Sequence, residues 1–347
     1  MGLTSDAEQP RSARGELTIA DVARLAGVSV PTVSKVVNGR SAVAAETRAR
    51  VEKVMKEHGY RRSRRATTLV GALEVVFHEL AGIYPVEIIK GIQRVAEEEQ
   101  LGVLVSESQG RQTPNRGWIE GVLARAPLGV IAVYSDLSAE QRSQLSAREI
   151  PLLALDPTGV PGDDVPSVGA TNWSGGLSAT RHLLDLGHRR IAAITGPSWA
   201  MSSRARLDGY RTALETAGIP VDPTLVRQGS YELSDGARHA ADLLRLADPP
   251  TAIFAFNDGM AIGVYHAASE AGRRIPDDLS VVGFDDFPPA QWLAPPMTTV
   301  HQPMRQMGEA AARMMVELAR GATPEVTRLE VPTQLVVRAS TAPPAVR

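Results

Sequence analysis

Residues Thr18–Gly39 read TIADVARLAGVSVPTVSKVVNG, and this stretch decides how the N-terminal part of the chain folds. Apolar residues recur at the spacing of one helix face, first before Gly27 and again after Pro31. Gly27 permits a tight turn, and Pro31 suits the first turn of a second helix. Two short helices joined in this way form a helix-turn-helix, whose second helix enters the major groove of DNA. The alternative is a pair of core helices in an ordinary α-helical domain, but the polar residues of the second segment and its basic flank favour DNA.

The motif T-I-x-D-V-A-x-x-A-G-V-S-x-x-T-V-S-x-V-x-N-G in this stretch resembles the headpiece of lactose-repressor (LacI-type) transcription regulators. The resemblance extends over residues 16–341. In that family the first residues of the second helix and a basic residue one turn later read the bases, and the matching positions are Val30, Pro31 and Lys35. The side chains of Val30 and Pro31 suit apolar contacts such as thymine methyl groups, whereas Lys35 suits guanine O6 and N7. We expect phosphate contacts from Thr18, Thr32, Ser34 and Asn38.

The charge of the chain is divided unevenly. Residues 1–68 hold 13 basic and 7 acidic side chains, a net charge of +6. The remainder holds 24 basic and 32 acidic side chains, a net charge of −8. A small basic module on a large acidic body is the pattern expected of a DNA-binding head on a sensing core.

A basic segment follows a third expected helix at about residues 45–58. Four arginines within residues 61–65 and no apolar periodicity predict a flexible linker or a segment that folds on DNA. The family resemblance implies a hinge helix at 63–69 that inserts Leu69 between base steps in the minor groove, with Arg62 and Arg65 on phosphates. Ser63, Thr67 and Thr68 depart from the family's usual residues, so the strength of this hinge is left open.

Length and composition bound the class of protein. A chain of 347 residues is long enough for two or three domains, and its composition is that of a globular protein. The chain has no cysteine and no run of about 18 apolar residues, so we expect neither disulfides nor a membrane span. The first fifteen residues lack the apolar region of a secretory signal. We therefore expect a disordered tail at 1–15 and a cytoplasmic protein.

From residue 70 onward, short apolar runs alternate with helical patterns, in two successive series. Such alternation predicts βαβ units and parallel sheets, hence an α/β core with two lobes. The resemblance implies a periplasmic-binding-protein-like core whose chain crosses between the lobes more than once. The expected division is a helix-turn-helix headpiece at 16–62, a hinge at 63–69 and a core at 70–347. Within the core, one lobe comprises about 70–170 with 301–329, and the other comprises 171–300 with 330–341.

Polar and aromatic side chains follow the predicted strands of both lobes. In open α/β sheets ligands bind beyond the carboxyl ends of the strands, so two facing lobes place these residues around one cleft. Aromatic faces together with carboxylates, amides and a guanidinium suit a polyhydroxylated ring such as a sugar. Each ring taken alone is equally compatible with the edge of a core. The candidate ligand residues are His78, Glu79, Tyr84, Tyr134, Asp156, Trp199, Arg206, Tyr231, Asn257, Asp285 and Trp292.

Three of these candidates also match positions of the family pattern. Arg206 in R-x-x-G-Y resembles the arginine that binds effector, and Asp285 in Gly-Phe-Asp-Asp and Asp156 resemble effector-binding aspartates. A structural ion-pair network is the alternative for these three charges. One headpiece offers too few contacts for specific affinity, so we expect a homodimer that binds a pseudo-palindromic operator. The carboxylates and rings together favour a mono- or oligosaccharide as effector. A purine or nucleoside effector is the alternative, and whether effector releases or promotes DNA binding is left open.

An enzyme is the main rival class. Paired acids lie in expected loops, and neither a G-x-S-x-G nor a P-loop motif is present. His182 and His188 are six residues apart, a poor spacing for a metal pair on a helix. We therefore expect no catalysis, no metal and no cofactor. A secreted sugar-binding protein without a DNA role would share the two-lobed core but would lack the headpiece. The C-terminus shows no heptad pattern that predicts a tetramerising coil.

Overall fold

The computed structural model describes residues 19–37, 43–57, 71–109, 112–159 and 165–345. The chain divides into two units, residues 1–68 and 69–347, and each is considered separately. No helix within these described ranges is long and apolar enough to cross a membrane.

The described residues of the first unit form three helices, α1 (Ile19–Ala26), α2 (Val30–Val37) and α3 (Ala45–Glu57). Gly27, between α1 and α2, has a φ of +63°, a left-handed conformation that glycine adopts without strain. Ser29 precedes α2, and its side chain accepts a hydrogen bond from the backbone N–H of Thr32 at 3.4 Å. The three helices bury one small apolar cluster, formed by Val22, Ala23, Ala26, Val33, Val36 and Val51. The predicted pair of short helices around a glycine turn is therefore present.

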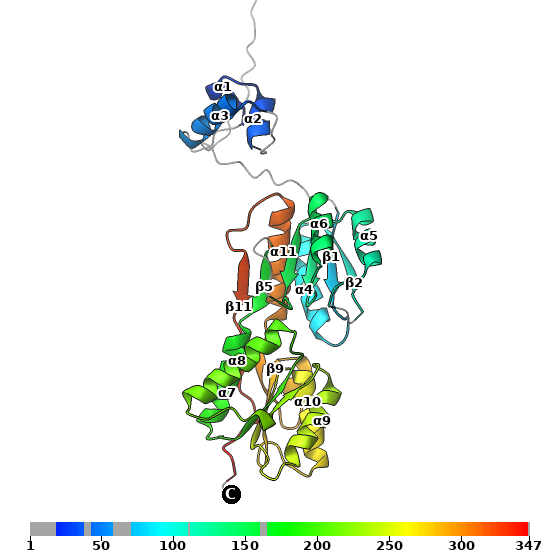
Figure 1. Ribbon diagram of the computed structural model, residues 1–347, viewed down its shortest axis with the longest axis vertical. Helices are drawn as coiled ribbons and strands as arrows, with labels where there is room; N and C mark the ends of the chain where they lie inside the picture. The colour runs from blue at the N-terminus through cyan, green and yellow to red at the C-terminus, as the bar shows by residue number, and fades with distance from the viewer. Residues whose placement is uncertain (1–18, 38–42, 58–70, 110–111, 160–164, 346–347) are drawn as a thin grey trace, which may run out of the picture. The chain divides into compact units, whose positions relative to one another are not determined.

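The second unit contains two six-stranded sheets, one in each lobe (Figure 1). The first sheet has the order β11-β5-β4-β3-β1-β2 and the second has the order β12-β10-β9-β8-β6-β7. Strands of the first sheet are β1 (Ala72–Phe77), β2 (Gly102–Glu107), β3 (Gly129–Val133), β4 (Leu152–Leu155), β5 (Ser167–Ala170) and β11 (Arg328–Val331). Strands of the second are β6 (Ile191–Thr195), β7 (Val226–Gln228), β8 (Ala252–Ala255), β9 (Ser280–Asp285), β10 (Thr298–His301) and β12 (Gln334–Val336).

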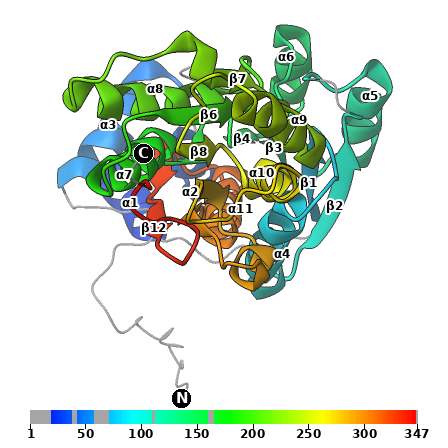
Figure 2. The ribbon, with the colours of Figure 1, turned by 90° about the horizontal axis from the view of Figure 1, so that it is seen from below.

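All strand pairs are parallel except β10 with β12. Helices cover both faces of each sheet, because parallel strands are joined by crossovers and their two faces are apolar. In the second lobe, α7 and α8 lie on one side of the sheet and α9 and α10 on the other (Figure 2). The helices are α4 (Tyr84–Glu98), α5 (Arg116–Arg125), α6 (Ala139–Ala147), α7 (Asn172–Asp185), α8 (Met201–Thr216), α9 (Leu233–Leu244), α10 (Asp258–Glu270) and α11 (Met304–Ala319). The fold class expected from the sequence is confirmed.

The chain passes between the lobes three times. The crossing segments lie between β5 and α7, between β10 and α11, and between β11 and β12. Thr171 and Thr333 tie two of them together: the backbone N–H of Thr333 donates to Thr171 Oγ1 at 2.9 Å, and Thr333 Oγ1 donates to the carbonyl of Thr171 at 3.1 Å. Strand β11 remains in the first sheet until Val331, two residues beyond the boundary at 329 expected from the sequence.

Candidate ligand cleft and DNA-binding helix

A cavity of about 380 Å³ lies where the carboxyl ends of the two sheets face each other. This volume is within the range of small-molecule sites, and both lobes contribute to its walls. Ten of the eleven residues predicted to bind ligand line it: His78, Glu79, Tyr84, Tyr134, Asp156, Trp199, Arg206, Tyr231, Asn257 and Asp285.

Four of these residues have left-handed backbone conformations, which are rare for residues other than glycine. Their φ angles are 49° at Tyr134, 51° at Asp156, 72° at Tyr231 and 118° at Asp285. Tyr134, Asp156 and Asp285 stand at or immediately after the ends of β3, β4 and β9. Backbone strain of this kind persists where surrounding structure enforces it, and it is concentrated at functional sites. Here it turns each side chain away from the sheet and into the cleft.

Two buried carboxylates face the cleft, one from each lobe. Asp156 accepts a hydrogen bond from the Tyr84 hydroxyl at 3.1 Å. Burial raises the pKa of Asp156, and Arg206 and the Tyr84 hydrogen bond partly oppose this shift. Burial also raises the pKa of Asp285 well above its ordinary value, with Arg206 opposing the shift and the acidic neighbours Asp258 and Asp156 adding to it. The cleft therefore holds oxygen acceptors whose negative charge is poorly solvated.

Arg206 stands on α8 in the second lobe, and its buried side chain lines the same cavity. Its Nε donates to Asn172 Oδ1 and its Nη2 to Gln302 Oε1, both at 2.8 Å, and Nη1 donates to the carbonyl of Phe256. Nη1 also lies 3.9 Å from Asp285 Oδ1. The guanidinium carbon sits 3.5 Å from the centroid of the Phe284 ring. Asn172 and Gln302 stand beside two of the interlobe crossings, so Arg206 connects the cleft to the segments about which the lobes would move.

Aromatic rings from both lobes meet across the cleft. The ring centroid of Trp199 lies 5.3 Å from that of His78 and 5.2 Å from that of Tyr134. Tyr134 also meets Tyr231 at 6.3 Å. These spacings are typical of packed aromatic pairs. The Tyr134 hydroxyl is buried and has no hydrogen-bond partner among the described residues. A ligand between the lobes would therefore contact ring faces and one donor that the protein leaves unpaired.

Trp292 is the predicted ligand residue that the structure places elsewhere. It ends the short helix η2 (Pro288–Trp292) with 81% of its surface exposed, and it does not line the cleft. The prediction treats every aromatic residue after a strand as a strand-end residue. Trp292 is seven positions beyond the end of β9, and the chain has turned away through Pro288 and Pro289.

Several lining residues were missed by the sequence reasoning, among them Ser202, Phe287 and Gln302. Gln302 follows β10, a four-residue strand that was not predicted because no helix separates it from β9 in the usual βαβ manner. The signal available was the β-branched run Thr298-Thr299-Val300, which is typical of a strand and precedes Gln302 by two residues.

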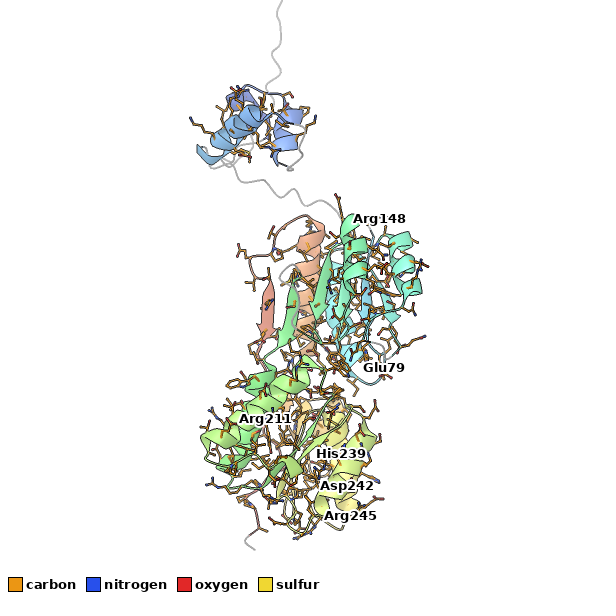
Figure 3. The ribbon with its side chains drawn as sticks, in the orientation of Figure 1. Glu79, Arg148, Arg211, His239, Asp242 and Arg245 are labelled. Atoms are coloured by element: carbon orange, nitrogen blue, oxygen red, sulfur yellow. The ribbon has the colours of Figure 1, made fainter. Side chains whose placement is uncertain are left out.

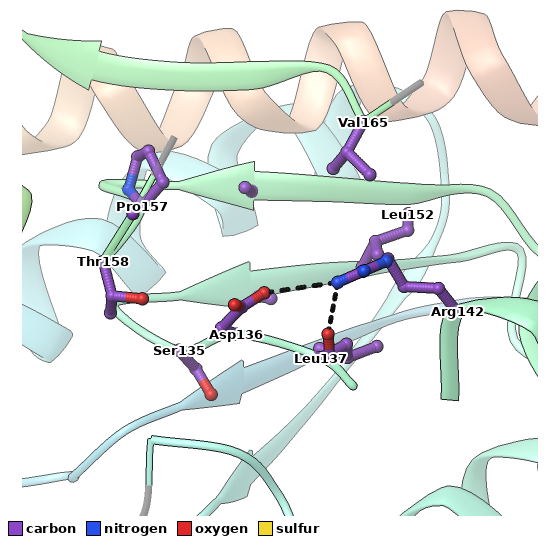
Figure 4. A pocket seen from close by; sticks show the side chains of 11 residues that line it. Ser135, Asp136, Leu137, Arg142, Leu152, Pro157, Thr158 and Val165 are labelled. Carbon is purple, nitrogen blue, oxygen red and sulfur yellow. Dashed lines mark hydrogen bonds and ion pairs between the residues drawn. The ribbon is translucent and has the colours of Figure 1, made fainter. Parts of the chain in front are cut away.

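A second cavity of about 310 Å³ lies within the first lobe and contains none of the predicted ligand residues (Figure 4). Its one cationic lining residue, Arg142, is 3.6 Å from Asp136 Oδ1 and also donates to the carbonyl of Leu137. The guanidinium of Arg142 is therefore already paired within the protein, so this cavity offers a ligand no unpaired cation from its lining. Within the described residues, no three His, Asp or Glu side chains are grouped so that they could hold a metal ion.

In the first unit, helix α2 presents the residues predicted to read bases. Val30, Pro31 and Lys35 are exposed on it, and Val30 keeps 47% of its surface in solvent. Their side chains are therefore accessible to a partner. Thr32, predicted to contact phosphate, shares a hydrogen bond of 2.8 Å with the Ser29 hydroxyl. Thr18, Asn38, Arg62, Arg65, Leu69 and the side chain of Ser34 lie outside the described residues, as does the hinge at 63–69.

Comparisons with known proteins agree with this arrangement of parts. Residues 18–63 match the family of bacterial regulatory proteins named lacI, and residues 180–341 match the periplasmic binding protein-like domain. The HTH-type transcriptional regulator DegA of Bacillus subtilis is 34% identical over 335 residues, which cover 94% of this chain and 98% of DegA.

Two solved structures also match over nearly the whole chain. A complex of the transcriptional regulator CelR with cellobiose has a TM-score of 0.72 at 34% identity, covering 94% of this chain and 100% of that one. The lac repressor dimer bound to operator and the anti-inducer ONPF has a TM-score of 0.68 at 30% identity, covering 94% and 99%.

A helix-turn-helix unit followed by a two-lobed binding core defines a class of ligand-responsive, DNA-binding transcription regulators. The chain belongs to the LacI family of these bacterial regulators.

Proposed function

We propose that this protein is a repressor whose operator affinity is controlled by a sugar bound between the lobes. The observation that carries the proposal is the composition of the cleft, where ring faces and buried carboxylates from both lobes surround one cavity. Rings stack on the apolar faces of sugars, and carboxylates accept hydrogen bonds from hydroxyl groups. The binding of cellobiose by the similar regulator CelR supports a mono- or oligosaccharide.

The DNA-binding form is a homodimer on a pseudo-palindromic operator. A single headpiece offers three short helices, too small a surface for specific affinity, whereas a two-fold dimer doubles the contacts and sets the half-site spacing. The lac repressor, which is similar over 94% of this chain, was solved as a dimer bound to operator. In this proposal residues 63–69 act as the hinge that carries lobe movements to the DNA.

Thermal unfolding of the purified protein against a panel of sugars and purines tests the effector class. A ligand at about 100 times its Kd should stabilise the folded state by about 2.7 kcal/mol, visible as a raised midpoint. Stabilisation by a sugar, lost in the Asp285→Asn variant and retained in Asp208→Asn on the exposed face of α8, is the expected result. If purines stabilise the protein and no sugar does, the effector contains a nucleobase and is not a sugar.

A further inference from the structure

We propose that the cleft is selective for the charge of its ligand: it accepts an uncharged sugar and rejects sugar phosphates, uronates and nucleotides. This inference rests on the proposed effector function and narrows it. It follows from the balance of charge around the cavity.

Acidic groups outnumber basic ones along the cleft. Four acidic side chains line it, Glu79, Asp156, Glu232 and Asp285, and its cationic groups are Arg206 and, when protonated, His78. No lysine lines the cavity. An anionic ligand is usually bound by several arginines, lysines or helix N-termini. The cleft has one guanidinium, and three of the helix N-termini that line it already carry an acidic residue in the first turn: Glu87 in α4, Asp235 in α9 and Asp258 in α10.

The N–H groups and the positive charge of that guanidinium already have partners within the protein. Three of the five N–H bonds of Arg206 go to the acceptors on Asn172, Phe256 and Gln302. Its charge lies 3.9 Å from Asp285 and over the face of Phe284. A phosphate or carboxylate entering here would lose its hydration beside Asp156 and Asp285 without gaining an unpaired cation, which is strongly unfavourable.

The approach to the cavity is acidic as well. Glu79 and Glu232 are exposed lining residues, one on each lobe, and Figure 3 shows Glu79 at the end of the first lobe that faces the second. Charge of one sign at the mouth of a cleft repels ligands of that sign during encounter. What remains favourable is a ligand whose hydroxyl groups donate to Asp156 and Asp285 and accept from the unpaired Tyr134 hydroxyl.

The potential of the cleft can be measured without knowing the effector, because the chain has no cysteine. Ala81→Cys and Leu233→Cys place one thiol on each wall, at exposed lining residues. Each is reacted with a cationic and an anionic methanethiosulfonate at pH 8, above the usual titration range of imidazole. The ratio of the two rates cancels the accessibility and acidity of the thiol. Ser146→Cys, exposed on α6 outside the cleft, is the matched control.

We expect the ratio of cationic to anionic rates at both cleft positions to exceed that at position 146 by about tenfold. A ratio equal to or below the control at both positions would overturn the inference. The second arm measures thermal stabilisation by glucose and cellobiose beside glucose 6-phosphate and cellobionate. If glucose 6-phosphate stabilises the protein as much as glucose does or more, or cellobionate as much as cellobiose or more, the inference that the cleft rejects anions is also overturned. If such an anion also shifts operator affinity, only the charge selectivity fails and the proposed regulatory function stands. If a neutral sugar binds without shifting operator affinity, the regulatory function fails and the charge selectivity stands.

Discussion

At the scale of single residues, Arg206 joins the cleft to two of the crossings between the lobes. Its guanidinium reaches Asn172, the first residue of α7 after one crossing, and Gln302, in the segment before α11. A ligand that displaces the charge of Arg206 would therefore act on both crossings at once. Coupling of this kind requires that the ligand interact differently with the two lobe arrangements.

Replacing Gln302 by Leu tests this connection. The change leaves one N–H of a buried guanidinium without its acceptor, so we expect a loss of about 1–3 kcal/mol in the free energy of unfolding. Effector-induced change in operator affinity should shrink more than effector affinity itself. Denaturant unfolding and operator titration measure the two effects. Glu309→Gln, which breaks an exposed ion pair with Arg94, is the control and should change stability by less than about 1 kcal/mol.

Asp258 predicts a pH dependence of stability. Burial raises its pKa to about 7, although it accepts hydrogen bonds from Thr299 Oγ1 and the Phe287 N–H. Between the ordinary aspartate pKa of about 3.9 and 7 the folded state binds more protons than the unfolded state, so stability falls as pH rises through that interval. Unfolding of the wild type and Asp258→Asn at several pH values measures this, and the variant should show a shallower decline. An unchanged slope would show that Asp258 titrates normally.

At the scale of elements, three helix pairs pack through reciprocal glycines. A Cβ at Gly91 of α4 would lie 2.1 Å from the Arg305 carbonyl oxygen of α11, and one at Gly308 would lie 2.4 Å from that of Ile88. The same reciprocal approach joins α7 to α8 and α9 to α10. Since no side chain separates the backbones, each pair moves as one body. The α7–α8 pair carries Asn172 and Arg206, so its close packing fixes the geometry of the cleft.

Gly176→Ala tests the role of that packing. A Cβ at Gly176 would lie 2.3 Å from the carbonyl oxygen of Arg206, so α8 must move. We expect a loss of about 1–3 kcal/mol in stability and a weaker affinity for the stabilising sugar. Gly169→Ala in β5 is the control, because a Cβ added there would meet no atom within 4 Å and its φ is not left-handed. Calorimetry measures the affinity of both variants. Equal sugar affinities in the two variants would show that the packing of α7 on α8 does not determine the geometry of the cleft.

Helix α2 predicts how Lys35 acts. Exposed one turn after Val30 and Pro31, Lys35 is placed to reach a guanine in the major groove. Lys35→Ala should therefore cost about 1–3 kcal/mol on preferred sequences and relax the preference at one base position. Selection from random DNA with wild type and variant measures this. A uniform loss over all sequences would mark Lys35 as a phosphate contact.

The helices, most strands and ten of the lining residues could be predicted because parallel strands bring their carboxyl ends to one edge of a sheet. Strands β5 and β10 could not, since no α-helix separates either of them from the strand before it, and β11 could not, since no α-helix separates it from β12. Gln302 was missed with β10 for that reason. Trp292 was assigned wrongly because sequence distance from a strand end does not reveal the turn through Pro288 and Pro289.

At the scale of the whole molecule, the proposed regulation requires that the arrangement of the two lobes and the binding of DNA by the headpiece be coupled. Rings of His78 and Tyr134 on one lobe pack on Trp199 of the other, and the Thr171–Thr333 hydrogen bonds hold two crossings together. Ligand entering between the rings changes the relative stability of lobe arrangements. Reciprocity then requires that operator DNA change the affinity for the ligand by the same factor.

The proposed regulation requires that the cleft control operator binding. The most direct measurement titrates selected operator DNA with the protein by fluorescence anisotropy, with and without the sugar that stabilises it, for wild type and Asp285→Asn. We expect an operator Kd that changes by about 5–150-fold with sugar in the wild type, and a Kd in Asp285→Asn that does not respond. Identical operator affinity with and without every stabilising ligand would contradict it.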